Sequence, residues 1–163
     1  MPRTGRPFSV RMANLGALGW VSDVRGYRYQ PTHPVTGRPW PPIPERLRGL
    51  WRSLVGGPEP ECCLVNLYRA GARMGLHRDE DEEALDVPVL SVSLGDAAIF
   101  RVGGLTRGGP TIRLRLESGD VVLLAGESRL AYHGVDRILH GSGDLVPGGG
   151  RINLTLRRVT RPA

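Results

Sequence analysis

The C-terminal two thirds of the chain alternate between short apolar runs and glycine-marked turns. Apolar–polar alternation is typical of half-buried strands, and short runs that are apolar throughout are typical of strands buried on both faces, here Val89–Leu94 and Val121–Leu124. Six strands with frequent turns and few helices favour a β-sandwich or jelly roll. The predicted strands are Cys62–Tyr68, Val87–Leu94, Ala97–Val102, Thr111–Leu116, Asp120–Leu124 and Arg151–Arg157.

The first sixty residues have a different pattern. Phe8–Met12 alternates and predicts a further strand, and a proline-rich loop follows over residues 31–42. Pro44 suits the first position of a helix, and Gly56 suits its end. Within that helix four apolar side chains form one stripe that predicts packing against the core: Leu47, Leu50, Trp51 and Leu54.

Residues 20–29 combine aromatic and basic side chains. Trp20, Tyr27 and Tyr29 lie beside Arg25 and Arg28. Such a stretch is typical of a surface that stacks on single-stranded bases and binds their phosphates. A hairpin of aromatics that covers the core explains the pattern equally well, and the residues alone leave both alternatives open.

Charge and composition narrow the class of protein. The chain has 163 residues, enough for one domain, and a net charge of +6 that comes entirely from arginine. The excess lies in residues 1–60, which suits a polyanion such as nucleic acid, although a solvated basic face is an alternative. Neither a signal peptide nor a membrane-spanning run is evident, which predicts a soluble cytoplasmic protein. Adjacent Cys62 and Cys63 are poor disulfide partners, and we expect buried thiols.

The candidate chemistry begins with His77 and Asp79. Side chains two residues apart share one face of an extended strand, so an imidazole and a carboxylate would lie together there. His133, in the segment Tyr132-His133-Gly134, is the candidate for a third ligand. Two histidines and one carboxylate, with other positions open, are the ligand set of non-haem Fe(II) oxygenases.

The last predicted strand has one polar and one apolar face. Arg151, Asn153, Thr155 and Arg157 alternate with aliphatic residues. The polar face belongs either to a solvent-exposed strand or to an inward-facing site. In the second case the two guanidinium groups suit a small dicarboxylate, because each can bind a carboxylate bidentately. A metal-dependent hydrolase would have no need of such a dicarboxylate site.

These motifs occur in an order, and at a spacing, that resembles the AlkB family of Fe(II)- and 2-oxoglutarate-dependent dioxygenases, especially the bacterial enzymes of alkylated-DNA repair. The resemblance extends over essentially the whole chain. It is carried by Leu18-Gly19-Trp20, Gly26-Tyr27-x-Tyr29, Pro39-Trp40-Pro41, Asn66-x-Tyr68, Gly71-Ala72, Leu76-His77-x-Asp79-x-Asp81-Glu82, Val89-x-Ser91-Val92-Ser93-Leu94-Gly95, Ala98-Ile99-Phe100, Gly119-Asp120-Val121-Val122, Gly126-Glu127-Ser128-Arg129, Tyr132-His133-Gly134 and Arg151-x-Asn153-Leu154-Thr155-x-Arg157.

The resemblance implies a role for each matched residue. His77, Asp79 and His133 resemble the iron ligands. The residues that resemble the 2-oxoglutarate site are Asn66, Tyr68, Arg151, Asn153 and Arg157. Those that resemble the site for the damaged base are Trp20 and Tyr27 as stacking lid residues, Asp81 as a partner of the exocyclic amine, and Arg129 as a residue of the pocket.

The resemblance also implies a fold and an activity. We expect a mainly β protein with a flanking helix, a double-stranded β-helix or jelly roll, in one domain over residues 1–163. Residues 1–58 would form a nucleotide-recognition lid and a supporting helix, and residues 59–163 the catalytic core. The implied reaction removes alkyl groups from N-alkylated bases such as 1-methyladenine and 3-methylcytosine, using Fe(II), 2-oxoglutarate and O2 and releasing formaldehyde, succinate and CO2.

The implied partner is alkylated DNA, mainly single-stranded, bound by a monomer without contact to a membrane. Double-stranded DNA and RNA are open alternatives, and so is a protein substrate within the same chemistry. A jelly-roll binding module without enzymatic activity is a further alternative. It accounts poorly for a chain that has kept all three candidate ligands and both candidate cosubstrate arginines.

The chain departs from the family pattern at two points. The resemblance begins some way into a family member's sequence, which puts outer sheet packing in question while leaving the matched site residues in place. In addition, Leu123 and Leu124 stand where bacterial repair enzymes often have an aromatic residue near the cosubstrate. We expect a slightly wider pocket there.

Overall fold

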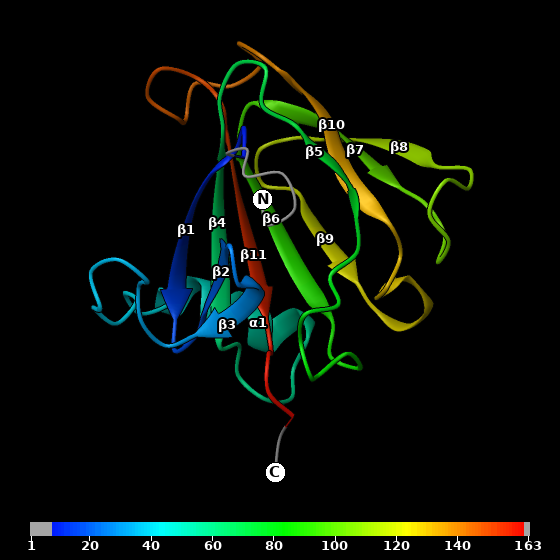
Figure 1. Cartoon of the computed structure of the whole chain (residues 1–163). Helices are drawn as coiled ribbons and strands as arrows, with labels where there is room; N and C mark the ends of the chain where they lie inside the picture. Colours follow the sequence, from blue (N-terminus) through cyan, green and yellow to red (C-terminus); the bar gives the residue numbers. More distant parts are fainter. Residues whose placement is uncertain (1–7, 162–163) are drawn as a thin grey trace.

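The computed structural model describes residues 8–161, which form two facing β-sheets, a two-stranded hairpin and one α-helix (Figure 1). The five-stranded sheet has the order β1 (Arg11–Gly16), β4 (Cys62–Tyr68), β11 (Arg151–Arg157), β6 (Val89–Gly95), β9 (Val121–Leu124). The four-stranded sheet has the order β5 (Met74–His77), β10 (His133–Leu139), β7 (Ala97–Val102), β8 (Ile112–Leu116). The hairpin pairs β2 (Gly19–Asp23) with β3 (Gly26–Gln30).

The chain crosses repeatedly between the two large sheets. Strands β4, β6, β9 and β11 lie in the five-stranded sheet, while β5, β7, β8 and β10 lie in the four-stranded sheet, and all neighbouring strands pair antiparallel. This alternation is the jelly-roll arrangement, which confirms the predicted fold class.

Two apolar clusters hold the layers together. Between the sheets, Tyr68, Phe100, Val135 and Ile138 are buried in one cluster. On the other face of the five-stranded sheet, α1 (Glu45–Leu54) packs the fully buried Trp51 against a second cluster that includes Leu156. The apolar stripe predicted this packing. Pro44 is the residue before the helix, one position earlier than expected, because its ψ of 140° is extended. No helix within residues 8–161 is both long and apolar enough to cross a membrane.

The structure confirms three predicted strands at their predicted bounds, namely β4, β7 and β11. The expected burial of Val121–Leu124 on both faces was wrong. Strand β9 is the edge of its sheet, and Val121 and Leu123 are each 37% exposed. The first strand begins at Arg11 and continues to Gly16, so only its start overlaps the predicted range 8–12.

The two cysteines are fully buried, as the sequence led us to expect, and they are not bonded to each other. Burial raises the pKa of Cys62 to about 11 and that of Cys63 to about 12, so the reactive thiolate is scarce at neutral pH. We predict that neither thiol reacts measurably with a maleimide in the folded protein within an hour at pH 7.5. In denaturant both should react within minutes, as a mass shift for two adducts would report.

Candidate functional site

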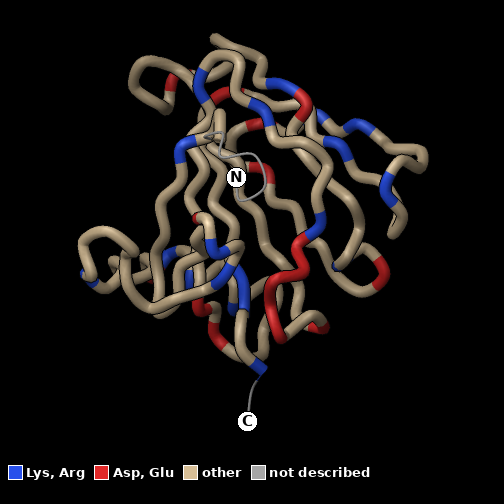
Figure 2. The backbone as a smooth tube through the Cα atoms, in the orientation of Figure 1, with Lys and Arg blue, Asp and Glu red and all other residues tan. Residues whose placement is uncertain are grey.

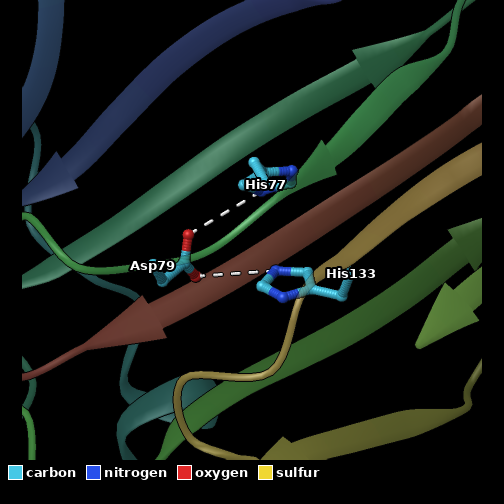
Figure 3. A group of neighbouring side chains, drawn as sticks. All are labelled: His77, Asp79 and His133. Atoms are coloured by element: carbon cyan, nitrogen blue, oxygen red, sulfur yellow. Dashed lines mark ion pairs between the residues drawn. The ribbon is translucent and has the colours of Figure 1, made fainter. Parts of the chain in front are cut away.

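Three side chains that could hold a metal ion meet between the sheets. His77 ends β5, Asp79 follows two residues later, and His133 begins β10, where it pairs with His77 in register. One atom from each residue lies within 4.8 Å of the others. The Asp79 carboxylate points one oxygen at each imidazole, with Oδ1 3.8 Å from His77 Nε2 and Oδ2 3.9 Å from His133 Nε2 (Figure 3).

Backbone carbonyls orient both imidazole rings. Nδ1 of His77 lies 2.9 Å from the carbonyl oxygen of Gly75, and Nδ1 of His133 lies 2.9 Å from that of Ala131. Each Nδ1–H can donate to its carbonyl, which leaves the lone pair of each Nε2 facing Asp79. Metal-bound histidines are usually oriented in this way, so the three residues fit a metal ion. Burial lowers the pKa of His133 and favours the neutral ring that binds metals.

Asp79 is kept ionised by its surroundings. Burial by itself raises the pKa of its carboxyl group, but the Arg157 guanidinium and the two imidazoles outweigh this effect, so the pKa lies below its ordinary value. Arg157 donates from Nη2 to Asp79 Oδ2 at 2.7 Å. The cluster therefore presents an anionic carboxylate between two imidazoles.

The polar face of β11 points inward, which decides between the two alternatives that the sequence left open. Arg151, Asn153, Thr155 and Arg157 are all buried, beside the metal cluster. On the opposite face of the strand, Leu156 is fully buried in the cluster under α1. Both faces of β11 are thus covered, because it lies at the centre of its sheet.

Arg151 is buried with part of its guanidinium group unpaired. Its Nη2 donates to Ser93 Oγ at 2.9 Å and to Asn153 Oδ1 at 2.7 Å, while Nε and Nη1 have no partner. The guanidinium lies 5.4 Å from the centre of the Tyr68 ring. A buried donor without a partner costs about 1–3 kcal/mol, so such atoms are expected where a ligand supplies the acceptor. A carboxylate of 2-oxoglutarate fits this requirement.

Two further buried atoms of the predicted cosubstrate site have no hydrogen-bond partner, and a tyrosine hydroxyl offers an additional donor. Asn66 Oδ1 and Arg157 Nη1 are buried without a partner. Burial raises the pKa of Tyr68 to about 12, so its hydroxyl remains a neutral donor. Asn153 differs, because its amide is already engaged: its oxygen also accepts from Ser91 Oγ, and its nitrogen donates to Thr155 Oγ1. In this structure Asn153 therefore orients Arg151.

The β2–β3 hairpin carries two stacked aromatic rings. The rings of Trp20 and Tyr27 lie 5.1 Å apart at an angle of 19°. Trp20 Nε1 donates to Asp81 Oδ2 at 2.9 Å, which joins the hairpin to the segment that follows Asp79. Tyr27 is half exposed at the outside of the stack. The structure thus brings Trp20, Tyr27 and Asp81 together, beside the segment that carries Asp79.

A buried glutamate in the acidic segment was missed from the sequence. Six acids in residues 79–86 suggested a solvated loop, but Glu82 is buried. It accepts hydrogen bonds from Tyr29 Oη and from Arg129 Nη2 at 3.2 Å, and it forms an ion pair with Arg157 Nε at 3.2 Å. No periodicity marks this residue. Its three partners are distant in the sequence and meet it only in the fold.

Arg129, the predicted residue of the base pocket, is held by contacts within the protein. It is 3% exposed, and its guanidinium donates to the carbonyl oxygens of Val87 and Asp79 at 2.8 Å each, in addition to Glu82. Arg129 therefore fixes the backbone of the segment that carries Asp79 and Asp81. Its place in a base pocket stays a prediction.

The hydrogen bond from Tyr29 to Glu82 should contribute measurably to the free energy of unfolding. We predict that Tyr29→Phe lowers the free energy of unfolding by about 1–2 kcal/mol, because a buried carboxylate loses a donor, and lowers the melting temperature by about 3–6 °C. Tyr27→Phe is the matched control, since the Tyr27 ring lies at the surface of the same hairpin. Equal melting temperatures for the two variants would contradict the assignment.

The arginines of the first sixty residues lie in more than one place. Arg25 and Arg28 at the hairpin both pair with Asp23, at 3.3 and 2.9 Å, so one carboxylate serves two guanidinium groups. Arg48 and Arg52 lie on α1, pair with glutamates, and are on the side of the sheet away from the metal cluster. Phosphate binding by this part of the chain stays a prediction. Arg3 and Arg6 lie outside the described residues.

Comparison with known proteins gives consistent results. Residues 1–157 match the model of the 2OG-Fe(II) oxygenase superfamily. An alpha-ketoglutarate-dependent dioxygenase AlkB homolog from Caulobacter vibrioides is 65% identical over 157 residues, covering 95% of this chain and 71% of that protein. Alpha-ketoglutarate-dependent dioxygenase AlkB from Escherichia coli is 45% identical, covering 95% of this chain and 74% of that protein.

A solved structure agrees with the fold. The structure of OsALKBH1 superimposes with a TM-score of 0.80 at 32% identity, covering 93% of this chain and 78% of that chain. More distant relatives are named for substrates, among them a DNA N(6)-methyladenine demethylase from Arabidopsis thaliana and a tRNA demethylase from Schizosaccharomyces pombe.

Proposed function

This chain belongs to the AlkB family of the 2OG-Fe(II) oxygenase superfamily, and from that premise we propose that it removes alkyl groups from N-alkylated bases in DNA, mainly single-stranded. It is a dioxygenase that depends on Fe(II), 2-oxoglutarate and O2. The proposed substrate type is a base with a methyl group on a ring nitrogen, such as 1-methyladenine or 3-methylcytosine.

His77, Asp79 and His133 are the proposed iron ligands. Their geometry favours this role because both Nε2 lone pairs and the carboxylate face one another across less than 5 Å. Bound iron and 2-oxoglutarate together supply the oxidant, with decarboxylation of the cosubstrate to succinate. The protein keeps the ligands in their binding states: the rings by their carbonyl partners, and Asp79 by the Arg157 cation.

Arg151 and Arg157 are the proposed partners of the two cosubstrate carboxylates. Arg157 lies against Asp79 and therefore suits the carboxylate at the metal end, while Arg151 is six residues away on the same strand and suits the distal one. A six-residue separation along a strand is roughly 20 Å between backbone positions, but the long side chains can converge from both ends. Asn66 and Tyr68 on the neighbouring strand β4 complete the proposed site.

Trp20 and Tyr27 are the proposed platform for the alkylated base. A methyl group on the pairing edge of a base is inaccessible in a duplex, so the base must be unpaired or extruded before it can react. Extrusion costs stacking energy, and stacking against an aromatic side chain returns about 1–3 kcal/mol per base. Asp81, held by Trp20 Nε1, offers a carboxylate beside the aromatic pair that can accept from an exocyclic amine.

The observation that favours a nucleobase over a protein side chain is the stacked aromatic pair on the hairpin. A planar base has a face that can stack on Tyr27 or Trp20, whereas a methylated lysine has no planar face. RNA shares the base and remains the second candidate, since one distant relative is named as a tRNA demethylase.

The substrate is tested by comparing three methylated polymers under one condition. Formaldehyde release should be measured from a 1-methyladenine DNA oligonucleotide, the RNA of the same sequence, and a peptide with methylated lysine. We expect the DNA to react with the highest kcat/KM, followed by RNA. A peptide that reacts faster than both nucleic acids would overturn the proposal.

Loss of the aromatic platform should affect the nucleic acid and spare the cosubstrate. We predict that Trp20→Ala raises the KM for the methylated oligonucleotide by about tenfold, as expected for one lost stacking partner. The 2-oxoglutarate concentration at half-maximal rate should change by less than about twofold, because the cosubstrate residues lie on β4 and β11. A variant whose oligonucleotide KM equals that of the wild type would remove Trp20 from the base site.

A further inference from the structure

The outer face of the four-stranded sheet is rich in arginine. We define the basic face as Arg101 on β7, Arg113 and Arg115 on β8, and Arg137 on β10. Residues that alternate with them, including Phe100, Leu116 and Ile138, are buried between the sheets. Side chains alternate along a strand, so the four arginines point away from the core and into solvent. Figure 2 shows the basic segments along this sheet.

Strand register places the four arginines in two rows. Arg101 pairs with Arg113 directly across β7 and β8. In the next row, Ile99 pairs with Arg115 on one side and with Arg137 on the other. Like charges opposite each other destabilise a sheet, so this arrangement has a cost that an ordinary solvated surface has no reason to bear.

The charges are only partly compensated. Asp136 lies 3.5 Å from Arg101 and 3.7 Å from Arg113, so one carboxylate serves two guanidinium groups. Glu117 pairs with Arg115, but both side chains are more than half exposed and the pair is correspondingly weak. A cavity of about 330 Å³ opens between β5 and β10 beside Arg101 and is also lined by Arg73. The face therefore retains an excess of positive charge.

The acidic segment that follows Asp79 has the opposite character. Glu80, Asp81, Glu83 and Asp86 are exposed in it, and Asp81 bonds to Trp20 of the hairpin. These carboxylates repel a phosphate backbone locally. Attraction for that backbone is therefore expected from another part of the surface.

We propose that the basic face binds the phosphate backbone of the strand that flanks the base in the site, an inference that rests on the proposed function. Strand β5, which ends at His77, is the first of the sheet, and β10, β7 and β8 follow in order. With strands about 4.8 Å apart, the path from β5 to β8 is roughly 15 Å, enough for several nucleotides. Long substrates reach this face, and very short ones do not.

The test removes three charges from the face and three from elsewhere. The triple variant R113Q/R115Q/R137Q should bind an unmodified 20-nucleotide single strand about tenfold more weakly than the wild type in fluorescence anisotropy at 100 mM salt. Its slope of log K against log salt should be shallower by about 2, since each phosphate contact on a single strand contributes about 0.7. The matched control R46Q/R48Q/R52Q on α1 loses the same net charge and should bind as the wild type does.

A second variant tests the proposal by a predicted gain in DNA affinity. Asp136→Asn frees Arg101 and Arg113 for phosphate and should tighten binding of the same strand by about twofold or more. A misfolded protein cannot produce this gain. Weaker binding by Asp136→Asn, or equal losses in the two triple variants, would overturn the proposal. So would binding of anionic vesicles, but not of DNA, through the face.

The proposed function and the basic face can fail separately. If the face contributes to catalysis on long strands, the ratio of kcat/KM for a methylated 20-mer to that for a methylated trinucleotide falls about tenfold in R113Q/R115Q/R137Q. If the wild type acts on no methylated base while the triple variant still loses DNA affinity, the basic face is supported and the proposed function is excluded. If the wild type removes the methyl group while the triple variant binds DNA as the wild type does, the proposed function is supported and the basic face is excluded.

Discussion

Asp79→Ala should abolish dealkylation, with kcat lowered at least about 1,000-fold. The side chain is the only carboxylate in the candidate metal cluster, and it stands between both imidazoles. Loss of a residue that merely orients a metal ligand already costs 10–100-fold in metal affinity or activity, so loss of a ligand should cost more. The change also removes a partner of Arg157. Burial alone lowers the pKa of this arginine, but the neighbouring carboxylates outweigh burial, so the pKa is raised.

The measurement needs both turnover and iron binding. Iron content after anaerobic reconstitution should fall together with kcat, while thermal melting shows whether the variant is folded. Asp79→Asn keeps the shape of the side chain, and it replaces the alanine variant in both measurements if that variant is unfolded at the assay temperature. Asp86→Ala, an exposed acid of the same segment, is the matched control and should retain full iron and activity. Near-wild-type dealkylation by either Asp79 variant would exclude Asp79 as a ligand.

Arg151→Lys should raise the 2-oxoglutarate concentration at half-maximal rate by about 100-fold. The lysine keeps the charge but loses the planar fork, and charge-assisted hydrogen bonds through that fork contribute about 1.5–3 kcal/mol each. Two of the three guanidinium nitrogens of Arg151, Nε and Nη1, are buried without a protein partner. Arg151 is a cleaner target than Arg157, which also pairs with Asp79 and Glu82.

The control for Arg151→Lys is Arg158→Lys. Arg158 follows β11 directly and pairs with Glu61 at 3.4 Å, outside the candidate cosubstrate site. Its cosubstrate dependence should stay within about twofold of the wild type, and the DNA affinity of both variants should be unchanged. An Arg151→Lys protein with ordinary 2-oxoglutarate dependence would place the cosubstrate elsewhere.

The sequence predicted the parts of the fold in which pattern and burial agree. The strand over Arg151–Arg157 alternates strictly between polar and apolar residues, so it was predicted, with two alternatives left for its polar face. Helix α1 has a complete apolar stripe, so both the helix and the face that packs against the core were predicted. Strand β10 was not predicted, and β5 was expected only as an extended segment at His77 without its bounds. The four residues of β5 include a glycine, and β10 has a register irregularity between Val135 and Arg137 that interrupts the alternation.

The sequence predicted which residue types form the candidate site, but not the backbone path and hydrogen bonds that bring them together. His77 and Asp79 were expected on one strand face, but β5 ends at His77 and Asp79 lies beyond it. Their convergence depends on the backbone of that segment, which Arg129 and Glu82 hold through contacts between residues about fifty positions apart. Charge counts along the chain placed the basic excess in the first sixty residues and gave no sign of the arginines that strand register gathers on the four-stranded sheet.

The most direct test is the stoichiometry of products from a 1-methyladenine oligonucleotide, with Fe(II) and 2-oxoglutarate supplied together and each omitted in turn. The predicted result is formaldehyde and succinate in equal amounts, formed only when both are present. Formaldehyde without 2-oxoglutarate would contradict the central claim, and so would the absence of both products from folded, iron-loaded protein.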